Sequence, residues 1–358
     1  MKPPKNREII IFFLAIFSFS ACKKNDSDKN MGEAYTKIEY TGATFLSEGR
    51  YFLAGASIGN KMLFAGGYNG ATRSKTVDMY DVSTNTWTTA QLSKARTNLA
   101  AAAAGNKILF AGGHDGFPTT AVDIYDASTN IWTTAQLAGA STFLAAAAAG
   151  NKIVFAGGYD GFFPSKAVDI YDVSTNTWTM DQLSKARYNL AGAAAGNKIV
   201  FAGGSDGIST FNSADIYDIS TNKWTTAELS EAREGLAAAA AGNKIVFAGG
   251  YNDVSQSKTV DIYDVSTNSW TTAELSEGRS NLAAATAGNK IVFAGGGNGI
   301  SHSKTVDIYD VSTNTWTTTE LSEAREALAA AAAGNKMIFA GGVGTALSKT
   351  ADVFTLSK

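Results

Sequence analysis

The sequence predicts an all-β fold in which seven four-stranded sheets are arranged radially around one axis. Three observations lead to this fold class. One segment of about 46 residues recurs in six near-identical copies, flanked by the two halves of a seventh. Each copy contains short runs with strand composition, separated by turn residues. The piece that the last half lacks is present before the first copy. A fixed period of this length is typical of closed or stacked repeat architectures.

Two landmarks keep the same step along the chain. Gly-Gly pairs begin at Gly66, Gly112, Gly157, Gly203, Gly249, Gly295 and Gly341. Tryptophans recur in register with these pairs, at Trp87, Trp132, Trp178, Trp224, Trp270 and Trp316.

Each copy is expected to form four strands. The Lys-Ile-Val-Phe-Ala run before Gly-Gly is a short apolar run bounded by turn residues, which favours a strand buried on both faces. Val-Asp-Ile-Tyr-Asp-Val is rich in β-branched and aromatic residues and alternates as a strand does. Ser-Thr-Asn is a turn signal, and Trp-Thr-Thr starts another strand.

The alanine-rich run that begins each copy is the fourth strand. Alanine favours helices, but a helix of five to seven residues that meets Gly-Asn-Lys at once could hardly nucleate. Strands that converge on an axis have no room for larger side chains, so alanine suits an innermost strand. The order from the axis outwards is therefore Ala-rich, Gly-Gly, Tyr-bearing and Trp-bearing.

Four-stranded sheets repeated radially form a β-propeller. The recurrent Gly-Gly, Tyr and Trp resemble the kelch repeat family, and the resemblance covers about residues 36–358. The arginine that this family has ahead of the inner strand is matched in six copies and replaced by Ser141 in the other. The six arginines are Arg50, Arg96, Arg187, Arg233, Arg279 and Arg325.

The ends of the chain predict how the ring closes. The chain stops just after a third strand at residues 350–356, so residues 36–46 are expected to supply the outer strand of the seventh blade. Thr41 falls at the position of the tryptophan, which predicts that this is the weakest blade. A closed ring removes a free sheet edge. The alternative is a six-bladed ring with a spare fragment.

Residues 1–21 have the features of a secretion signal. A basic start is followed by an apolar run from Ile9 to Phe19, which as a helix would span about 16 Å and is too short to cross a bilayer. Phe19-Ser-Ala-Cys22 resembles the lipobox of bacterial lipoproteins, which implies lipidation of Cys22; an ordinary signal peptide is the alternative. Residues 22–34 are polar and read as a flexible tether, and residues 35–358 form the propeller domain.

These features predict a monomeric protein that is anchored to the cell envelope by lipid, at the outer membrane. Both the periplasmic and the outer side of that membrane fit the prediction. The formal net charge of -2 and the 17% of charged residues offer no basic field for nucleic acid. With one cysteine and two histidines, the chain predicts no metal site and no cofactor.

The candidate binding residues lie on one predicted face. The loops after Gly-Gly and the links between blades share this face and vary among the copies, whereas the hairpins of the other face hardly vary. The residues that follow Gly-Gly include Tyr68, His114, Tyr159 and Tyr251, and exposed aromatic side chains suit recognition. Packing against neighbouring blades is the alternative role for these side chains.

The six arginines are expected to ring the mouth of the channel on the same face. Arginine grips carboxylates in a bidentate way, and some kelch propellers bind acidic peptides there, so the ring is a candidate anion-binding site. The alternative is structural, because Glu231, Glu234, Glu277, Glu323 and Glu326 lie in the same links.

The expected function is a non-catalytic binding module that recognises a protein segment or a glycan. Copper-radical oxidases of the kelch type need two histidines, tyrosines and a cross-linked cysteine in one site. The two histidines of this chain, His114 and His302, lie four blades apart, and its one cysteine, Cys22, belongs to the predicted signal, so this activity is not expected. Asp78 and its six equivalents recur identically, which indicates a structural role. The alternative function is a carbohydrate-processing enzyme similar to the kelch-type sialic acid mutarotases.

Overall fold

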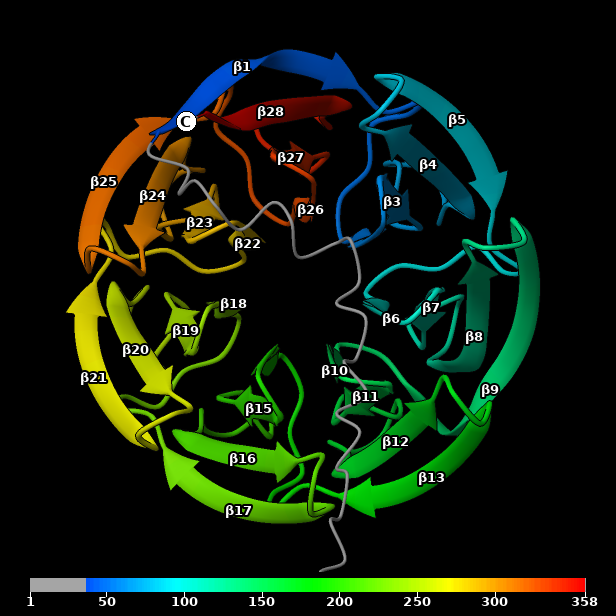
Figure 1. Ribbon diagram of the computed structural model, residues 1–358, viewed down its shortest axis with the longest axis vertical. Coiled ribbons are helices and arrows are strands. Elements are labelled where there is room, and N and C mark those ends of the chain that lie inside the picture. Colours follow the sequence, from blue (N-terminus) through cyan, green and yellow to red (C-terminus); the bar gives the residue numbers. More distant parts are fainter. Residues whose placement is uncertain (1–36, 358) are drawn as a thin grey trace, which may run out of the picture. The chain divides into compact units, whose positions relative to one another are not determined.

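The computed structural model describes residues 37–357, and within this range all regular secondary structure is β. Seven four-stranded antiparallel sheets stand around a central axis (Figure 1). The predicted seven-bladed propeller is therefore confirmed. No helix of the described residues has the length and apolar character needed to cross a membrane. The predictions for residues 1–34, including lipidation of Cys22, lie outside the described residues.

Each blade contains one strand from each of four concentric sets. The innermost strands are β2 (Ala54–Ile58), β6 (Ala100–Ala104), β10 (Ala145–Ala149), β14 (Ala191–Ala195), β18 (Ala237–Ala241), β22 (Ala283–Ala287) and β26 (Ala329–Ala333). The second strands are β3 (Lys61–Ala65), β7 (Lys107–Ala111), β11 (Lys152–Ala156), β15 (Lys198–Ala202), β19 (Lys244–Ala248), β23 (Lys290–Ala294) and β27 (Lys336–Ala340).

The outer two sets complete the blades. The third strands are β4 (Thr76–Asp81), β8 (Thr119–Asp126), β12 (Ala167–Asp172), β16 (Ser213–Asp218), β20 (Thr259–Asp264), β24 (Thr305–Asp310) and β28 (Thr350–Ser357). The outer strands are β5 (Thr86–Gln91), β9 (Ile131–Ser141), β13 (Thr177–Gln182), β17 (Lys223–Glu228), β21 (Ser269–Glu274), β25 (Thr315–Glu320) and β1 (Lys37–Phe45). Blade 1 begins with β2, and blades 2 to 7 follow in chain order.

The alanine-rich runs are the innermost strands, as predicted, because neighbouring blades approach closely near the axis. A Cβ atom on Gly55 of β2 would lie 2.4 Å from the carbonyl oxygen of Ala330 on β26. A similar approach explains the Gly-Gly pairs: Gly66 has a φ of 67°, and a Cβ there would lie 2.5 Å from the carbonyl oxygen of Arg96 in the next blade. A residue with a Cβ atom at either position would collide with the neighbouring blade, and at Gly66 it would also have to adopt an unfavourable left-handed conformation.

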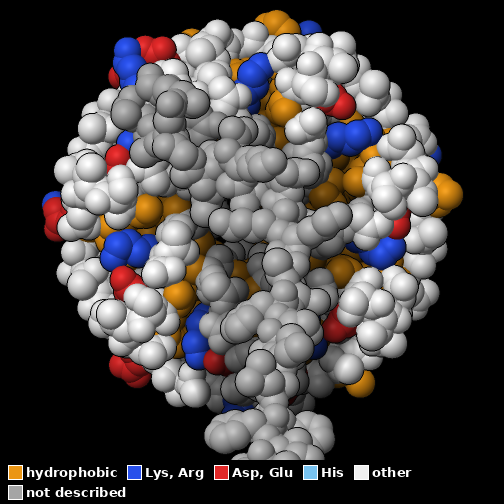
Figure 2. All heavy atoms as spheres, in the orientation of Figure 1, with side chains coloured by type: hydrophobic (Ala, Val, Ile, Leu, Met, Phe, Trp, Pro, Cys, Tyr) orange, Lys and Arg blue, Asp and Glu red, His pale blue; other side chains and the backbone are white. Residues whose placement is uncertain are grey.

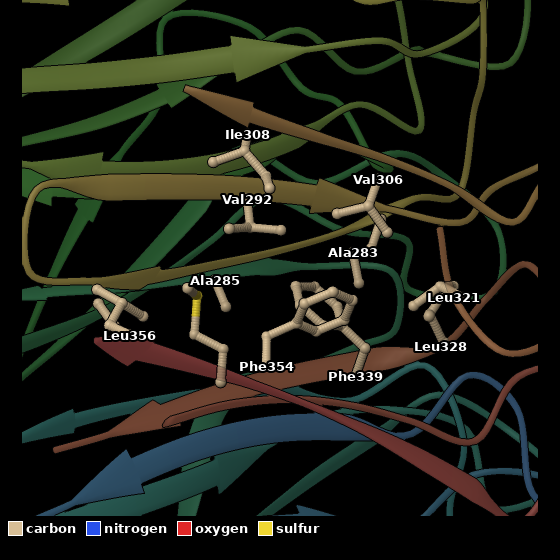
Figure 3. Packing of buried hydrophobic residues seen from close by; sticks show 13 residues of the cluster. Ala283, Ala285, Val292, Val306, Ile308, Leu321, Leu328, Phe339, Phe354 and Leu356 are labelled. Carbon is tan, nitrogen blue, oxygen red and sulfur yellow. The ribbon is translucent and has the colours of Figure 1, made fainter. Parts of the chain in front are cut away.

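The hydrophobic core lies between adjacent blades. Figure 3 shows this packing between blades 6 and 7, where Val292 and Val306 face Phe339 and Phe354. The second strands are buried on both faces, as their apolar composition predicts. Each Tyr of a third strand pairs with the Trp of its outer strand, as Tyr80 does with Trp87, and these rings cover the outer part of the core.

The seventh blade is closed by the N-terminal strand. Strand β1 pairs antiparallel with β28, and these strands have nine and eight residues, compared with six each for β4 and β5. The prediction that Thr41 takes the tryptophan position is wrong. A bulge between Tyr40 and Gly42 shifts the register, so Tyr40 is the residue opposite Phe354. An aromatic pair therefore occupies the outer position in this blade too.

Candidate functional site

The six arginines are buried, and the prediction that they form a binding site at the mouth of the channel is wrong. All six side chains have 0% exposure. Each guanidinium group pairs with the aspartate of the third strand in its own blade. These pairs are Arg50–Asp78, Arg96–Asp123, Arg187–Asp215, Arg233–Asp261, Arg279–Asp307 and Arg325–Asp352.

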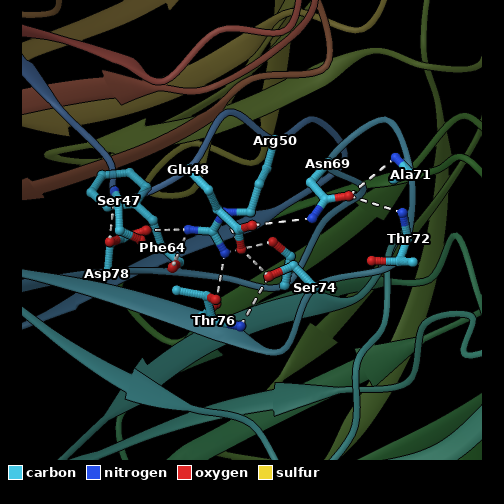
Figure 4. Close-up of polar contacts among 11 residues, drawn as sticks. Ser47, Glu48, Arg50, Phe64, Asn69, Ala71, Thr72, Ser74, Thr76 and Asp78 are labelled. Carbon is cyan, nitrogen blue, oxygen red and sulfur yellow. Dashed lines mark hydrogen bonds and ion pairs between the residues drawn. The ribbon is translucent and has the colours of Figure 1, made fainter.

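The surroundings of Arg50 show why these groups cannot reach a ligand (Figure 4). One nitrogen, Nη1, donates to the carbonyl oxygens of Gly66 at 2.8 Å and Thr76 at 2.6 Å. The other, Nη2, donates to the Asp78 carboxylate. Burial lowers the pKa of Arg50, and the carboxylate of Asp78 opposes this shift. The arginines therefore hold the blade link onto the sheet, and the aspartates have the structural role predicted for them.

A closed ring of backbone hydrogen bonds surrounds the mouth of the channel on the variable face. Seven link residues, one per blade, each donate the backbone N–H to the carbonyl oxygen of the equivalent residue in the preceding blade, at 2.9 to 3.2 Å. The last bond closes the circle, from Phe52 to Ala327. All seven have φ between 53° and 61°. The ring residues are Phe52, Asn98, Phe143, Asn189, Gly235, Asn281 and Ala327.

These ring residues line a cavity of about 400 Å³. The leucine that follows each of them lines it too, from Leu53 to Leu328, and these leucines are buried. The left-handed conformation is unfavourable for Phe52, Phe143 and Ala327, which have a Cβ and no side-chain amide. The mouth therefore has an identical backbone in every blade but different side chains, with two aromatic rings and three amides.

An aromatic cleft opens beside this mouth, between blades 3 and 4. It has a volume of about 440 Å³, and Phe143 belongs both to it and to the ring. Tyr159 and Tyr188 meet edge to face, with ring centroids 5.8 Å apart. Phe162 and Ile208 stand at its rim, exposed by 81% and 91%. Exposed apolar side chains around an apolar cleft are typical of an interaction surface.

The Tyr188 side of the aromatic cleft is also polar. Burial raises the pKa of Tyr188, and the negative charge of Glu234 adds to this shift. Glu234 accepts a hydrogen bond of 3.0 Å from the side-chain amide of Asn189, which connects it to the ring at the mouth. Asp206 belongs to the lining as well. The cleft thus combines aromatic faces with the carboxylate of Asp206, and the charge of Glu234 acts on Tyr188 from outside the lining.

A second cleft, of about 730 Å³, lies between blades 6 and 7, extends to Gln256 of blade 5, and is more polar in its side chains. Gln256, His302 and Glu326 contribute to its lining, and Ile300, 97% exposed, stands beside them. The Nδ1 atom of His302 lies 3.7 Å from Oε1 of Glu326 and has no hydrogen-bond partner among the described residues. This pair is unique to one sector of the face.

The structure does not bring the four predicted residues after Gly-Gly into one site. Each is half-buried and forms a bridge to the blade link beside it. Tyr68 packs on Tyr51, and His114 accepts a 3.1 Å hydrogen bond from Arg73. Burial and then Arg73 lower the pKa of His114. Of the four, Tyr159 alone lines the aromatic cleft. The alternative prediction, packing against a neighbouring blade, describes Tyr159, which packs on Tyr188 of blade 4, whereas Tyr68 and Tyr51 belong to the same blade.

Sequence reasoning missed the residues that make the clefts distinctive. Ile208, His302 and Glu326 were not among the predicted site residues. The signal that could have found them is departure from the repeat. Positions that differ between copies lie on the variable face, and large apolar residues at loop tips have no core to enter.

The opposite face repeats one ion pair in blades 2 to 6. The lysine that begins the second strand pairs with the aspartate that ends the third, as in Lys107–Asp126 at 2.9 Å and Lys198–Asp218 at 2.7 Å. On the face that Figure 2 shows, basic, acidic and hydrophobic side chains recur around the ring. No group of three or more His, Cys, Asp or Glu among residues 37–357 is placed to hold a metal ion.

Comparisons with known proteins agree with this architecture. The family model of the KLHDC2/KLHL20/DRC7 Kelch-repeats domain matches residues 143–342, and that of the Kelch motif matches residues 49–91 and 95–136. No curated protein matches the chain. The solved structure of YjhT is similar, with a TM-score of 0.58 and 16% identity over 74% of this chain and 97% of that chain. At this identity the likeness shows the fold alone.

Proposed function

Because this chain belongs to the kelch-repeat family of β-propellers, we propose that it is a non-catalytic binding module that engages its ligand through the variable face. One observation carries the proposal. Exposed large apolar side chains gather on the loops of this face, around a cleft that shares Phe143 with the lining of the channel mouth. Side chains this exposed bury almost no apolar surface in the folded chain, so a role in binding explains their presence better than a role in folding.

A protein segment with a large apolar side chain is the ligand that best fits the aromatic cleft. Phe162, Phe163 and Ile208 lie at its rim, and Tyr159 and Tyr188 lie within it. Anchors of this kind dominate protein interfaces when they fill a desolvated pocket. Glycans also stack on aromatic rings and bond to carboxylates, so a glycan is the second ligand class, which the experiment below separates from the first.

The proposal includes a lipid tether at Cys22 that holds the module at the cell envelope. It rests on the basic start, the apolar run and the small residues before Cys22. A polar tether over residues 22–34 would allow the domain to turn toward its ligand.

The binding experiment uses two ligand libraries. The detergent-solubilised full chain is screened against phage-displayed random peptides and against a glycan array. We expect enriched peptides that share an aromatic or large aliphatic residue. The double substitution Phe162→Ser and Phe163→Ser should weaken that binding by at least about tenfold.

The matched control is Met180→Ser, which changes a residue of β13 that is 72% exposed and outside the cleft. It should bind as the unsubstituted protein does. Glycan enrichment that depends on Phe162 and Phe163 would assign the glycan class. Equal binding by all three proteins, or no enrichment from either library, would overturn the proposed site.

A second candidate function, sugar processing, is favoured by the cleft between blades 6 and 7. Exchange of sugar anomers needs an acid and a base near the ring oxygen and the anomeric hydroxyl. His302 and Glu326 are unlike groups that converge on one cleft. Exchange of sugar anomers, followed by NMR, should be faster with the protein than without it and should lose this acceleration with His302→Ala. An unaccelerated exchange would remove this candidate.

A further inference from the structure

Blade 3 departs from the other six blades at the buried ion pair. Ser141 stands where the other blades have arginine, and its hydroxyl donates to the carbonyl oxygen of Gly157 at 2.9 Å. The aspartate of the pair is retained as Asp169, which is 6% exposed. No Arg, Lys or His of residues 37–357 lies within ion-pair distance of Asp169. One of its oxygens, Oδ1, accepts the backbone N–H of Ala138 at 2.9 Å.

The residue that covers the arginine is changed in the same blade. In blade 1, Glu48 bonds to Ser74 above Arg50, and Ser74 is 5% exposed (Figure 4). In blade 3 the equivalent of Glu48 is Gly139, and a Cβ built there would meet nothing within 4 Å. Ser165, the equivalent of Ser74, is half-buried instead of buried. The position of the arginine is therefore both unfilled by a side chain and open to the surface.

A cavity of about 20 Å³ lies at this place. Ser141, Gly139, Ser165 and Asp169 contribute to its lining, together with backbone of β11 and β12. This is room for about one water-sized group, which is the space of a single guanidinium nitrogen. In the other blades one nitrogen makes the central contacts. Nη2 of Arg96 donates to Phe110 O at 3.0 Å and to Asp123 Oδ2 at 2.6 Å.

The same acceptors are present in blade 3. Phe155 is the equivalent of Phe110, Ala167 that of Ala121, and Asp169 that of Asp123. Among the described residues no group donates to Oδ2 of Asp169, and burial raises the pKa of this carboxyl. A buried carboxylate without a cation is costly, so a cation that enters recovers that cost.

We propose that the cavity beside Asp169 is a binding site for a guanidinium group. One nitrogen lies between Asp169 Oδ2 and the carbonyl oxygen of Phe155, and the rest of the group lies toward the opening at Gly139. A charge-assisted bond to a buried carboxylate is the strongest contact of this kind. The group comes either from a small guanidine compound or from an arginine side chain of a partner, and this site is independent of the aromatic cleft.

The test measures binding of ethylguanidinium to the full chain by calorimetry and by the thermal unfolding midpoint. We expect saturable binding with a rise of about 2 °C in the midpoint. The substitution Ser141→Arg places a covalent guanidinium in the cavity and should abolish binding. Asp169→Asn keeps the side-chain shape without the charge and should weaken binding by at least about tenfold; it also serves if the Ser141→Arg protein does not fold.

Further arms identify the source and the selectivity. Binding of the peptide glycyl-arginyl-glycine without binding of ethylguanidinium would assign the group to a partner's arginine, and binding of both would include small guanidines. Ethylammonium should bind more weakly than ethylguanidinium. Equal binding of the two cations, equal binding by the unsubstituted and Asp169→Asn proteins, or no saturable binding of any guanidinium probe would overturn the proposal.

Discussion

Tyr40 of the first strand packs edge to face against Phe354 of the last strand, with ring centroids 5.6 Å apart. The two residues are also directly opposite in the β1–β28 ladder. Residues more than three hundred positions apart therefore close the ring, and we expect the stability of the ring to depend on the N-terminal strand.

Deletion of residues 34–46 should lower the thermal unfolding midpoint sharply. The deletion removes β1, exposes the edge of β28 and removes Leu46, which is 2% exposed. Calorimetry of the deleted and intact proteins measures the change. Glu39→Ala, a change at an exposed residue of β1, is the control and should leave the midpoint within about 1 °C. An unchanged midpoint after deletion would contradict closure by β1.

Asp307→Ala should destabilise the fold by about 3–5 kcal/mol, because it leaves the buried guanidinium of Arg279 without its carboxylate. Urea unfolding measures the loss. The comparison is Lys304→Ala, which breaks an ion pair with Glu320 between side chains 52% and 62% exposed. A surface pair of this kind contributes about 0–1 kcal/mol. Similar losses for the two variants would show that the buried pair has no special role.

Asp169 should make the protein less stable as the pH rises. Burial raises its pKa, so the folded state binds the proton more tightly than the unfolded state does. Its contribution is fully present below the ordinary carboxyl pKa of about 4 and is lost as the pH rises through the folded-state pKa. Urea unfolding midpoints across the acidic range, compared between the unsubstituted protein and Asp169→Asn, isolate this contribution. Parallel pH profiles for the two proteins would refute it.

Ala327→Gly should stabilise the protein by about 1 kcal/mol. Ala327 has a φ of 54°, which is unfavourable for a residue with a Cβ, and glycine adopts it freely. Ala329→Gly, two residues later in β26, is the control and should destabilise. Thermal unfolding of the three proteins gives both signs in one experiment. A loss of stability with Ala327→Gly would mean that the methyl group contributes more to packing than the conformation costs.

Cys22→Ala should release the protein from the membrane fraction into the soluble fraction. The reason is that the lipid would be carried by this sulfur atom, and a signal peptide cleaved elsewhere would leave no anchor. Cell fractionation and immunoblotting measure the distribution. Replacement of Ser20 by Ala keeps a small residue before the cysteine and should leave the protein in the membrane. Continued membrane association of Cys22→Ala protein would count against lipidation.

The sequence predicted the blades well because the repeat shows each strand several times. The Gly-Gly pair, the Tyr and the Trp fix the register of a blade, and any single copy would be weaker support. It predicted Tyr40 poorly because the bulge next to Gly42 is local to one strand and has no second copy for comparison.

The arginines show a different limit of sequence reasoning. A charged residue in a polar link is expected to be exposed. The burial of Arg50 is evident only from the structure, in which its guanidinium group pairs with the Asp78 carboxylate. The aromatic cleft was not predictable as a place, because it arises from Tyr159 and Tyr188 in adjacent blades, whose distance depends on how the blades pack. The sequence shows that both tyrosines are present but does not show that they are in contact.

In the hydrogen-bonded ring at the mouth, the backbone conformation does not depend on which side chains the ring residues carry. Its seven hydrogen bonds join backbone groups, so the side chain of a ring residue such as Asn98 can be exchanged without removing a hydrogen bond of the circle. Substitution at these sites is therefore expected to change the side chains at the opening and to leave its hydrogen-bonded backbone in place. Duplication of such blades therefore creates a set of ring positions whose side chains can change one at a time, so that binding specificity can change while the fold is retained.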